Sequence, residues 1–332
     1  VGLEGLKKSV GKHAAGVVIG DSPLQDFLPL QKDSNGEIIT QWDKKMVESL
    51  GFLKMDFLGL KTLDVVSDAI KMIPSMKLSD LDTIPLDDTP TFDLLRAADT
   101  VGVFQLSERG MRHLLQKVSP DNIEEVSAVL ALYRPGPMAE NMHNDFADRK
   151  HGYQTTVPFH PDATQILEES YGLAPYQEQI LFIAQQFAGY SLPDADLLRR
   201  AMGQKDKALM EAERARFVQG CVDEGYGDKL GSQIFKMIEG FASYGFVKSH
   251  SMSYAFIAYW TAYLKANFRR EFMASLCSSV MDDHEQTAVY LADCRDAGMT
   301  VHPPDINESN RNYTVTPDGI RVGLGLVRNL GG

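Results

Sequence analysis

The chain has 332 residues, and its length predicts about two domains with a sizeable hydrophobic core. Its 33 Lys and Arg against 45 Asp and Glu give a formal net charge of −12. This charge excludes a basic protein that wraps nucleic acid, although it allows a local basic groove. The hydrophobic fraction of 44% and the charged fraction of 23% exclude a disordered chain.

Cysteines and apolar runs indicate a cytoplasmic protein with no membrane partner. Cys221, Cys277 and Cys294 are too widely spaced to predict a disulfide framework or a CxxC metal site. The longest apolar stretch, 253–266, is too short to span a membrane. No signal peptide opens the chain, and its first residue is Val1, which we interpret as a piece of a longer protein.

Two short strands are predicted near the start of the chain. Residues 13–20 read HAAGVVIG and predict a short buried strand, and residues 52–57 read FLKMDF. Because alternate side chains of a strand share a face, the apolar residues of 52–57 lie on one side and Lys54 and Asp56 on the other. This strand therefore places a cation and a carboxylate side by side.

The rest of the chain is predicted to be mainly helical. The segment 74–92 is rich in Pro and Asp, and its composition makes it the candidate domain boundary. Ser191 with Asp194 predicts a capping box, Ser251 is expected to cap a long helix, and a hairpin is predicted around 317–319. The expected helices are 62–73, 108–117, 121–132, 162–169, 176–188, 193–202, 206–223, 230–240, 251–267, 270–281 and 284–297.

Charged motifs give the candidate site residues, and each has a structural alternative. Asp56 is a hard oxygen ligand suited to Mg²⁺, and Lys54 suits a phosphate, whereas the alternative is a local ion pair. Arg199 and Arg200 present guanidinium groups that match phosphate oxygens. Their alternative is a solvated helix face on which Asp196 pairs with Arg200.

Residues 244–251, YGFVKSH followed by Ser251, form another candidate. The start of a helix here could hold an anion, with Lys248 and His250 adding charge and Tyr244 offering a stacking face. A P-loop is excluded because Lys248 does not follow its glycine directly. In the run YRPGP, prolines fix the direction of Arg134, the alternative being a plain interhelical turn.

Taken in order, the motifs resemble a known family. The chain is similar to the catalytic α subunit of bacterial DNA polymerase III, the C family of DNA polymerases, in its replicative type. The matching runs, which cover nearly the whole chain, are KHAAGVVI, LKMDFLGLKTL, GVFQL, ALYRPGP, DRKHG, YQEQI, AGYSL, ADLLRRAMG, YGFVKSH, YLKANF and PPDIN.

This resemblance implies an α+β fold, with a small partial palm sheet, mainly α-helical fingers and a C-terminal β-hairpin. Residues 1–11 resemble the end of the thumb, 12–61 the C-terminal part of the palm and 62–302 the fingers. Residues 303–332 resemble a hairpin and the truncated start of a helix-hairpin-helix region.

The resemblance also implies roles for matching residues. Asp56 resembles the third catalytic carboxylate, a Mg²⁺ ligand or its neighbour, and Lys54 resembles a phosphate contact beside it. Arg199 and Arg200 resemble the residues with which the fingers bind the incoming triphosphate. The remaining nucleotide contacts implied are Tyr244, Lys248, His250 and Arg134.

The family's first two catalytic carboxylates have no counterpart in this chain, since Asp194 and Asp196 have the spacing but fall within the fingers match. We therefore expect a part of a DNA-templated DNA polymerase that adds dNTPs to a primer 3′-OH by two-metal transfer, and expect the chain alone to be inactive. The expected partners are primer–template DNA, the incoming dNTP and, through regions outside this chain, holoenzyme subunits such as the sliding clamp. The alternative function is a non-catalytic fingers module that binds nucleotide or DNA.

Overall fold

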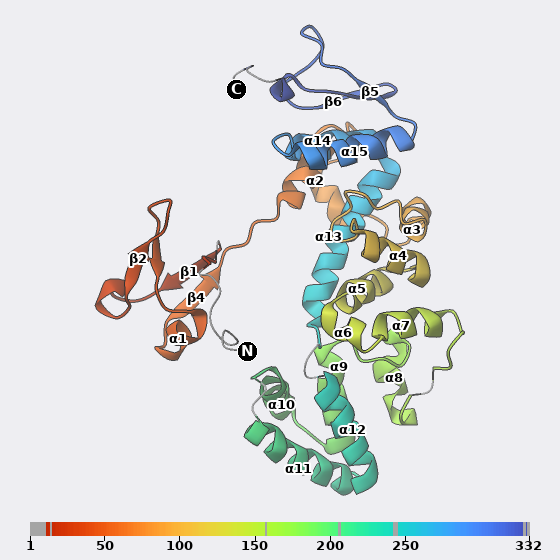
Figure 1. Ribbon diagram of the computed structural model, residues 1–332. Helices are drawn as coiled ribbons and strands as arrows, with labels where there is room; N and C mark the ends of the chain where they lie inside the picture. Colours follow the sequence, from red (N-terminus) through yellow and green to blue (C-terminus); the bar gives the residue numbers. More distant parts are fainter. Residues whose placement is uncertain are drawn as a thin grey trace, which may run out of the picture. The chain divides into compact units, whose positions relative to one another are not determined.

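The computed structural model describes residues 11–13, 15–156, 158–204, 207–241, 245–327 and 330. The chain divides into two compact units, Val1–Lys61 and Thr62–Gly332 (Figure 1). Among the described residues, no helix is both long and apolar enough to cross a bilayer. The three cysteines are buried and form no disulfide.

The first unit contains two small antiparallel sheets and one short helix. Strand β1 pairs with β4 and strand β2 pairs with β3, and helix α1 precedes β4. The bounds are β1 Gly16–Ile19, β2 Leu30–Lys32, β3 Ile38–Thr40, α1 Lys44–Ser49 and β4 Leu53–Asp56.

The prediction of a buried strand over 13–20 is wrong in its burial. Val17 and Ile19 of β1 remain 49% and 45% exposed. In a two-stranded sheet each strand has one neighbour, and Leu28 and Val47 are the only buried residues among those described in this unit. An apolar sequence pattern thus produced a strand without producing a core around it.

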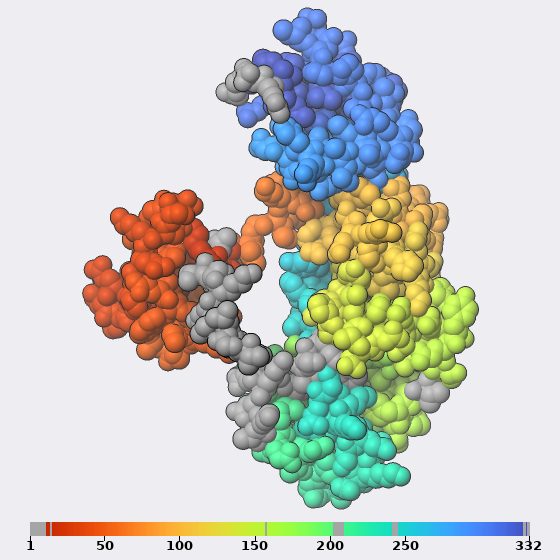
Figure 2. Space-filling model, viewed as in Figure 1, coloured from red at the N-terminus to blue at the C-terminus, as the bar shows by residue number. Residues whose placement is uncertain are grey.

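The second unit begins with a large hydrophobic core built around helix α13. Figure 1 shows α13 running past α3, α4 and α5, and in Figure 2 the side chains of these segments (yellow) cover much of the helix (cyan). The helices of this core are α2 Lys61–Lys71, α3 Thr89–Arg96, α4 Arg109–Val118, α5 Ile123–Leu132, α7 Met142–Lys150, α13 Lys248–Asn267, α14 Arg269–Ser279 and α15 His284–Asp296. The short helix α6 Pro135–Ala139 lies between α5 and α7 in the sequence.

A second hydrophobic core lies between residues 163 and 238. Its helices are α8 Thr164–Leu167, α9 Gln177–Ala188, α10 Leu192–Gln204, α11 Lys207–Asp223 and α12 Asp228–Phe241. The backbones of the two cores meet where Tyr176 forms a parallel bridge with Phe246. There the Gln177 N–H donates to the Phe246 carbonyl (2.8 Å) and the Phe246 N–H donates to the Pro175 carbonyl (2.9 Å).

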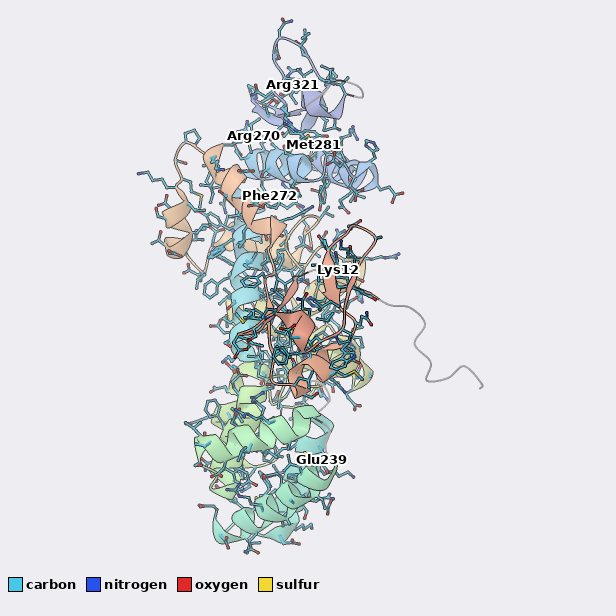
Figure 3. All side chains as sticks on the ribbon, turned by 90° about the vertical axis from the view of Figure 1, so that its left-hand side faces the viewer. Lys12, Glu239, Arg270, Phe272, Met281 and Arg321 are labelled. Carbon is cyan, nitrogen blue, oxygen red and sulfur yellow. The ribbon has the colours of Figure 1, made fainter. Side chains whose placement is uncertain are left out.

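A three-stranded sheet packs against α14. Its strands are β5 Thr300–His302, β6 Thr314–Thr316 and β7 Gly319–Arg321, in the order β5-β7-β6. Figure 3 shows Arg270 near the start of α14 and Arg321 in the strands beyond it. The Arg270 guanidinium donates to the carbonyls of Thr316 (3.2 Å) and Pro317 (2.6 Å), which ties the hairpin turn to the helix.

The expected α+β class is confirmed, including the C-terminal hairpin formed by β6 and β7. The predicted helices are all present, with small shifts at their ends, although 162–169 is split by short 3₁₀ turns. Helices α1, α3 and α7 were not predicted, and the YRPGP turn forms the short helix α6 with Arg134 as its N-cap. Proline at the first helical position favours this start because its missing N–H is not needed there.

Two further expectations are wrong. Segment 74–92 is not a domain boundary, because Leu81 and Ile84 from it are buried in the first core of the second unit. Ser251 is not a helix cap, because α13 already begins at Lys248. Ser251 is instead buried, and its hydroxyl donates to the Ser127 carbonyl (2.7 Å).

A buried charge holds the C-terminal half of α13. The side chain of Lys265 is 0% exposed, and its ammonium contacts carboxylate oxygens of Asp99 and Asp293, each at 3.0 Å. Arg269 also donates to Asp99. Burial disfavours the ionised form of Asp99, but the hydrogen bond from Arg269 and the charge of Lys265 outweigh it, so the pKa of this carboxyl lies below 3.8.

We predict that Lys265→Met lowers the free energy of unfolding by about 3–5 kcal/mol, because it leaves two carboxylates without their buried partner. Urea unfolding followed by circular dichroism measures this loss. Lys71→Met is the matched control, since Lys71 pairs with Asp68 at the surface and its loss should cost less than about 1 kcal/mol. Equal losses in the two variants would contradict the prediction.

The stabilising effect of Asp99 should depend on pH. A carboxyl whose pKa is lower in the folded chain than in the unfolded chain stabilises the fold only while it is ionised. We therefore expect the contribution of Asp99 to the free energy of unfolding to disappear as the pH falls below 3.8.

Candidate functional site

Lys54 and Asp56 lie together on one face of β4, as the alternation of the strand predicts. The Lys54 ammonium donates to the Asp56 carboxylate, and their side chains are 12% and 42% exposed. Opposite Asp56, Gly16 of β1 leaves room for this pair. A Cβ on Gly16 would lie 2.8 Å from the Lys54 Cε, so a larger residue would displace the lysine side chain.

The environment of Asp56 favours its ionised form. The hydrogen bond from Lys54 is the main cause that lowers the pKa of this carboxyl below 3.8, and the charges of Lys54 and His13 add to it. The His13 Nδ1 lies 3.9 Å from the Asp56 Oδ1. Asp56 thus presents an anionic oxygen donor on a partly exposed strand.

The described residues do not by themselves fit a Mg²⁺ site. Asp56 supplies one hard oxygen ligand, whereas no group of three or more His, Cys, Asp or Glu side chains suited to a metal occurs in the part of the chain that the structure describes. A magnesium ion takes six ligands and relies on carboxylates, water and substrate phosphates. Asp56 is therefore at most one member of a site that other groups must complete.

We predict that Lys54→Met raises the pKa of Asp56 toward 3.8, because the variant loses both the hydrogen bond and the charge that favour the carboxylate. The measurement is a pH titration of the side-chain carboxyl carbon by NMR. Lys44→Met serves as the control, since Lys44 acts on Asp56 through its charge alone and contributes less than Lys54 or His13. If the pKa of Asp56 in Lys54→Met equals that in the unmodified chain, Lys54 is not the cause of the lowered pKa.

Arg199 and Arg200 both pair with Asp196 on helix α10. The Arg199 Nε lies 2.8 Å from Asp196 Oδ1, and the Arg200 Nε lies 2.8 Å from Asp196 Oδ2. The arginine side chains are 35% and 63% exposed. The structure therefore shows the ion pairs that are expected if this stretch is a solvated helix face. Because exposed pairs of this kind are worth less than about 1 kcal/mol, they leave both guanidinium groups available to a stronger anion.

The first turn of α13 carries Lys248, and its anion position is filled by the chain itself. The Lys248 backbone N–H donates to both carboxylate oxygens of Glu178, at 3.0 and 2.9 Å. The Lys248 ammonium donates to Glu169 at 2.6 Å. Tyr244, which the sequence predicts as a stacking face, lies outside the described residues.

A row of aromatic rings follows the first turns of α13. We call Phe246, His250, Tyr254 and Phe104 the aromatic row. Ring centroids are 5.5 Å apart from Phe246 to His250, 4.4 Å from His250 to Tyr254, and 5.3 Å from Tyr254 to Phe104. The Arg134 guanidinium lies 4.2 Å from the Phe246 ring centroid, and burial lowers the pKa of Arg134.

The structure thus brings His250 and Arg134 to one row and places Lys248 on the same helical turn. Arg199 and Arg200 lie on α10, and no hydrogen bond or ion pair among the described residues joins either to Lys248 or His250. Sequence reasoning missed Phe246, Tyr254 and Phe104. His250 and Tyr254 have the i, i+4 spacing of one helix face, which could have revealed Tyr254, whereas Phe246 lies before α13. Phe104 comes from a distant loop and had no such signal.

Comparison with known proteins decides the family. The model described as bacterial DNA polymerase III alpha subunit finger domain matches residues 62–225, and the bacterial DNA polymerase III alpha NTPase domain model matches residues 1–59. The chain belongs to the bacterial DNA polymerase III alpha subunit family. A helix-hairpin-helix motif model also matches residues 298–332.

Members of this family share much of the sequence. The chain is 50% identical to the DNA polymerase III subunit alpha of Mycobacterium leprae, 45% to that of Caulobacter vibrioides and 44% to that of Thermus aquaticus, each over 99% of its length. It spans only 29%, 29% and 27% of the lengths of these relatives.

Proposed function

We propose that this chain is part of a DNA-templated DNA polymerase of bacterial chromosomal replication, which adds dNTPs to a primer 3′-OH in the cytoplasm. The observation that carries the proposal is the ionised Asp56 beside Lys54 on a strand of a chain from this family. Nucleotidyl transfer needs carboxylates that hold metal ions close to the reacting phosphate. Primer–template DNA and the dNTP are the proposed ligands, and holoenzyme subunits such as the sliding clamp are the proposed partners of regions outside this chain.

Within this proposal, the end of the thumb comprises residues 1–11, the C-terminal part of the palm residues 12–61 and the fingers residues 62–302. The last segment, 303–332, holds a hairpin and the truncated start of a helix-hairpin-helix region. Asp56 contributes one oxygen ligand toward Mg²⁺, and Lys54 fixes the ionisation and direction of that carboxylate. Because the family's first two catalytic carboxylates have no counterpart in this sequence, and the described residues show no further cluster of metal ligands, we expect the chain alone to be inactive.

The fingers segment is proposed to bind the incoming nucleotide. Arg199 and Arg200 offer guanidinium groups to the triphosphate, whose oxygens they match in geometry. Lys248 adds an ammonium, and the aromatic row with Arg134 and His250 offers flat surfaces suited to a base or sugar. Tyr244 is proposed as a further stacking contact on sequence grounds alone.

We predict that neither the chain nor its Asp56→Asn variant extends a primer by a single nucleotide in the presence of Mg²⁺, because one carboxylate cannot assemble the site. Gel analysis of a labelled primer gives the readout, with an active polymerase as the positive control for the DNA. Extension by the unmodified chain that is lost in Asp56→Asn would show that other acids of this chain complete the site.

The second candidate is a non-catalytic module that binds nucleotide or DNA, favoured by the lack of a metal-ligand cluster among the described residues. Both candidates share the basic contacts of the fingers. Binding without extension supports the module for the isolated chain, whereas extension excludes it.

We predict that the double variant Arg199→Ala, Arg200→Ala weakens binding of primer–template DNA with dNTP and flattens its salt dependence. Each lost phosphate contact should reduce the slope of log affinity against log salt by about 1. Fluorescence anisotropy over a range of salt concentrations measures both. The matched control is Lys71→Ala with Arg96→Ala, which removes the same charge from ion pairs elsewhere, one at the surface and one half-buried. An equal change in both double variants would indicate only an effect of net charge.

A further inference from the structure

Two glutamates from the second core reach the first turn of α13 in the first core. Glu178 lies in the first turn of α9, and Glu169 lies in the 3₁₀ turn Glu168–Ser170 before it. Both carboxylates contact one residue, Lys248, through its backbone N–H and its ammonium respectively. These contacts stand beside the only place where the backbones of the two cores form a bridge among the described residues, at Tyr176 and Phe246.

The contacts of Glu178 and Glu169 differ in whether they leave their Lys248 group accessible to an anion. The N–H groups of the first turn of a helix attract anions, and here the Glu178 carboxylate takes the first of them. A phosphate therefore has no access to that N–H while Glu178 is in place. The ammonium of Lys248 is different, because its pair with Glu169 is an exposed one, with side chains 34% and 32% exposed.

The pair of Lys248 and Glu169 also lines an open cleft. The cleft has a volume of about 440 Å³ and is bordered by Glu178 and by Phe182, which is 51% exposed. A solvated anion can therefore reach the ammonium from the cleft. Because an exposed ion pair is weak and a triphosphate carries several charges, the triphosphate competes well with the single Glu169 carboxylate.

We propose that Glu178 and Glu169 are positioning residues for anion capture by α13. Glu178 fixes the first turn of the helix against α9, and Glu169 holds the Lys248 ammonium in a pair that a nucleotide phosphate displaces. This inference rests on the proposed function, in which Lys248 contacts the incoming nucleotide. It assigns the anion contact to the Lys248 side chain and a competing, regulatory contact to Glu169.

The decisive variant is Glu169→Gln in the full 332-residue chain. It should bind a fluorescent dNTP, with primer–template DNA present, up to about fivefold more tightly, because Lys248 no longer has to leave an ion pair. The gain should vanish in the Lys248→Ala background. If Glu169 has only a structural role, Glu169→Gln should bind the dNTP with unchanged or lower affinity. Either result would overturn the proposal, provided that Lys248→Ala weakens binding and so shows that Lys248 contacts the nucleotide.

Glu168→Gln is the matched control. Glu168 is exposed and lines the same cleft, and its side chain has no hydrogen bond or ion pair among the described residues. The Glu168→Gln variant removes the same charge at the neighbouring position and should leave the affinity for the dNTP unchanged. A gain in Glu168→Gln equal to that in Glu169→Gln would reduce the effect to general charge and overturn the proposal.

A measurement without nucleotide separates this inference from the proposed function. Acetylation of Lys248 by an amine-reactive ester, followed by mass spectrometry, should be up to about fivefold faster in Glu169→Gln and unchanged in Glu168→Gln. In Glu178→Gln, amide hydrogen exchange over residues 248–251 should be about tenfold faster, since a charged acceptor is lost. Unchanged acetylation and exchange would overturn the inference. Accelerated rates together with a Lys248→Ala affinity equal to that of the unmodified chain would overturn instead the proposed nucleotide contact of Lys248.

Discussion

The fold of residues 62–332 depends on the burial of α13 together with its polar side chains. The helix has 20 residues, and Ser251, Tyr259, Thr261 and Lys265 are all buried. A buried polar group without a partner costs about 1–3 kcal/mol, and a buried charge costs more. Each of these side chains is instead paired with a segment far away in the chain, so that the helix fixes the surrounding loops as well as the core. The pairs are Ser251 with the Ser127 carbonyl, Tyr259 with the Pro85 carbonyl, Thr261 with the Phe104 N–H and Lys265 with Asp99.

The aromatic row and Arg134 rest on these same pairs. Phe104 reaches Tyr254 because its N–H donates to the Thr261 hydroxyl, about two turns further along α13. Arg134 follows α5, and α5 is attached to α13 through Ser127 and Ser251. The aromatic row is therefore a surface of the main core, and its geometry follows from buried hydrogen bonds that lie beneath it.

The second core joins this surface through a short backbone bridge and through charges. Tyr176 at the start of α9 is buried, and its hydroxyl lies 3.1 Å from that of Ser127. Burial raises the pKa of this phenol well above its ordinary value, so the hydroxyl stays protonated and able to donate. Glu178 and Glu169 add ionic contacts to Lys248 at the same junction.

Local sequence rules accounted for most elements and failed where burial had to be known. The Ser191 hydroxyl and Asp194 form the expected contact at the start of α10, since a cap depends only on neighbours three residues apart. Helix α7 escaped prediction because its sequence, MHNDFADRK, is largely polar and buries only Met142, Phe146 and Ala147. Helix α3 escaped because Pro90 lies within it, although Asp88 caps its start.

By itself, the sequence determined the family, the α+β class and the contacts between close neighbours. Lys54 meets Asp56 because a strand has a period of two, and Arg199 and Arg200 meet Asp196 because a helix brings residues three and four apart together. Only the tertiary structure decided that β1 is exposed, that Ser251 is buried, and that Lys248 faces Glu169 and Glu178. The partners of Lys248 lie 79 and 70 residues before it. No spacing rule encodes such a contact, because it is set by how two separate cores pack where α9 and α13 begin.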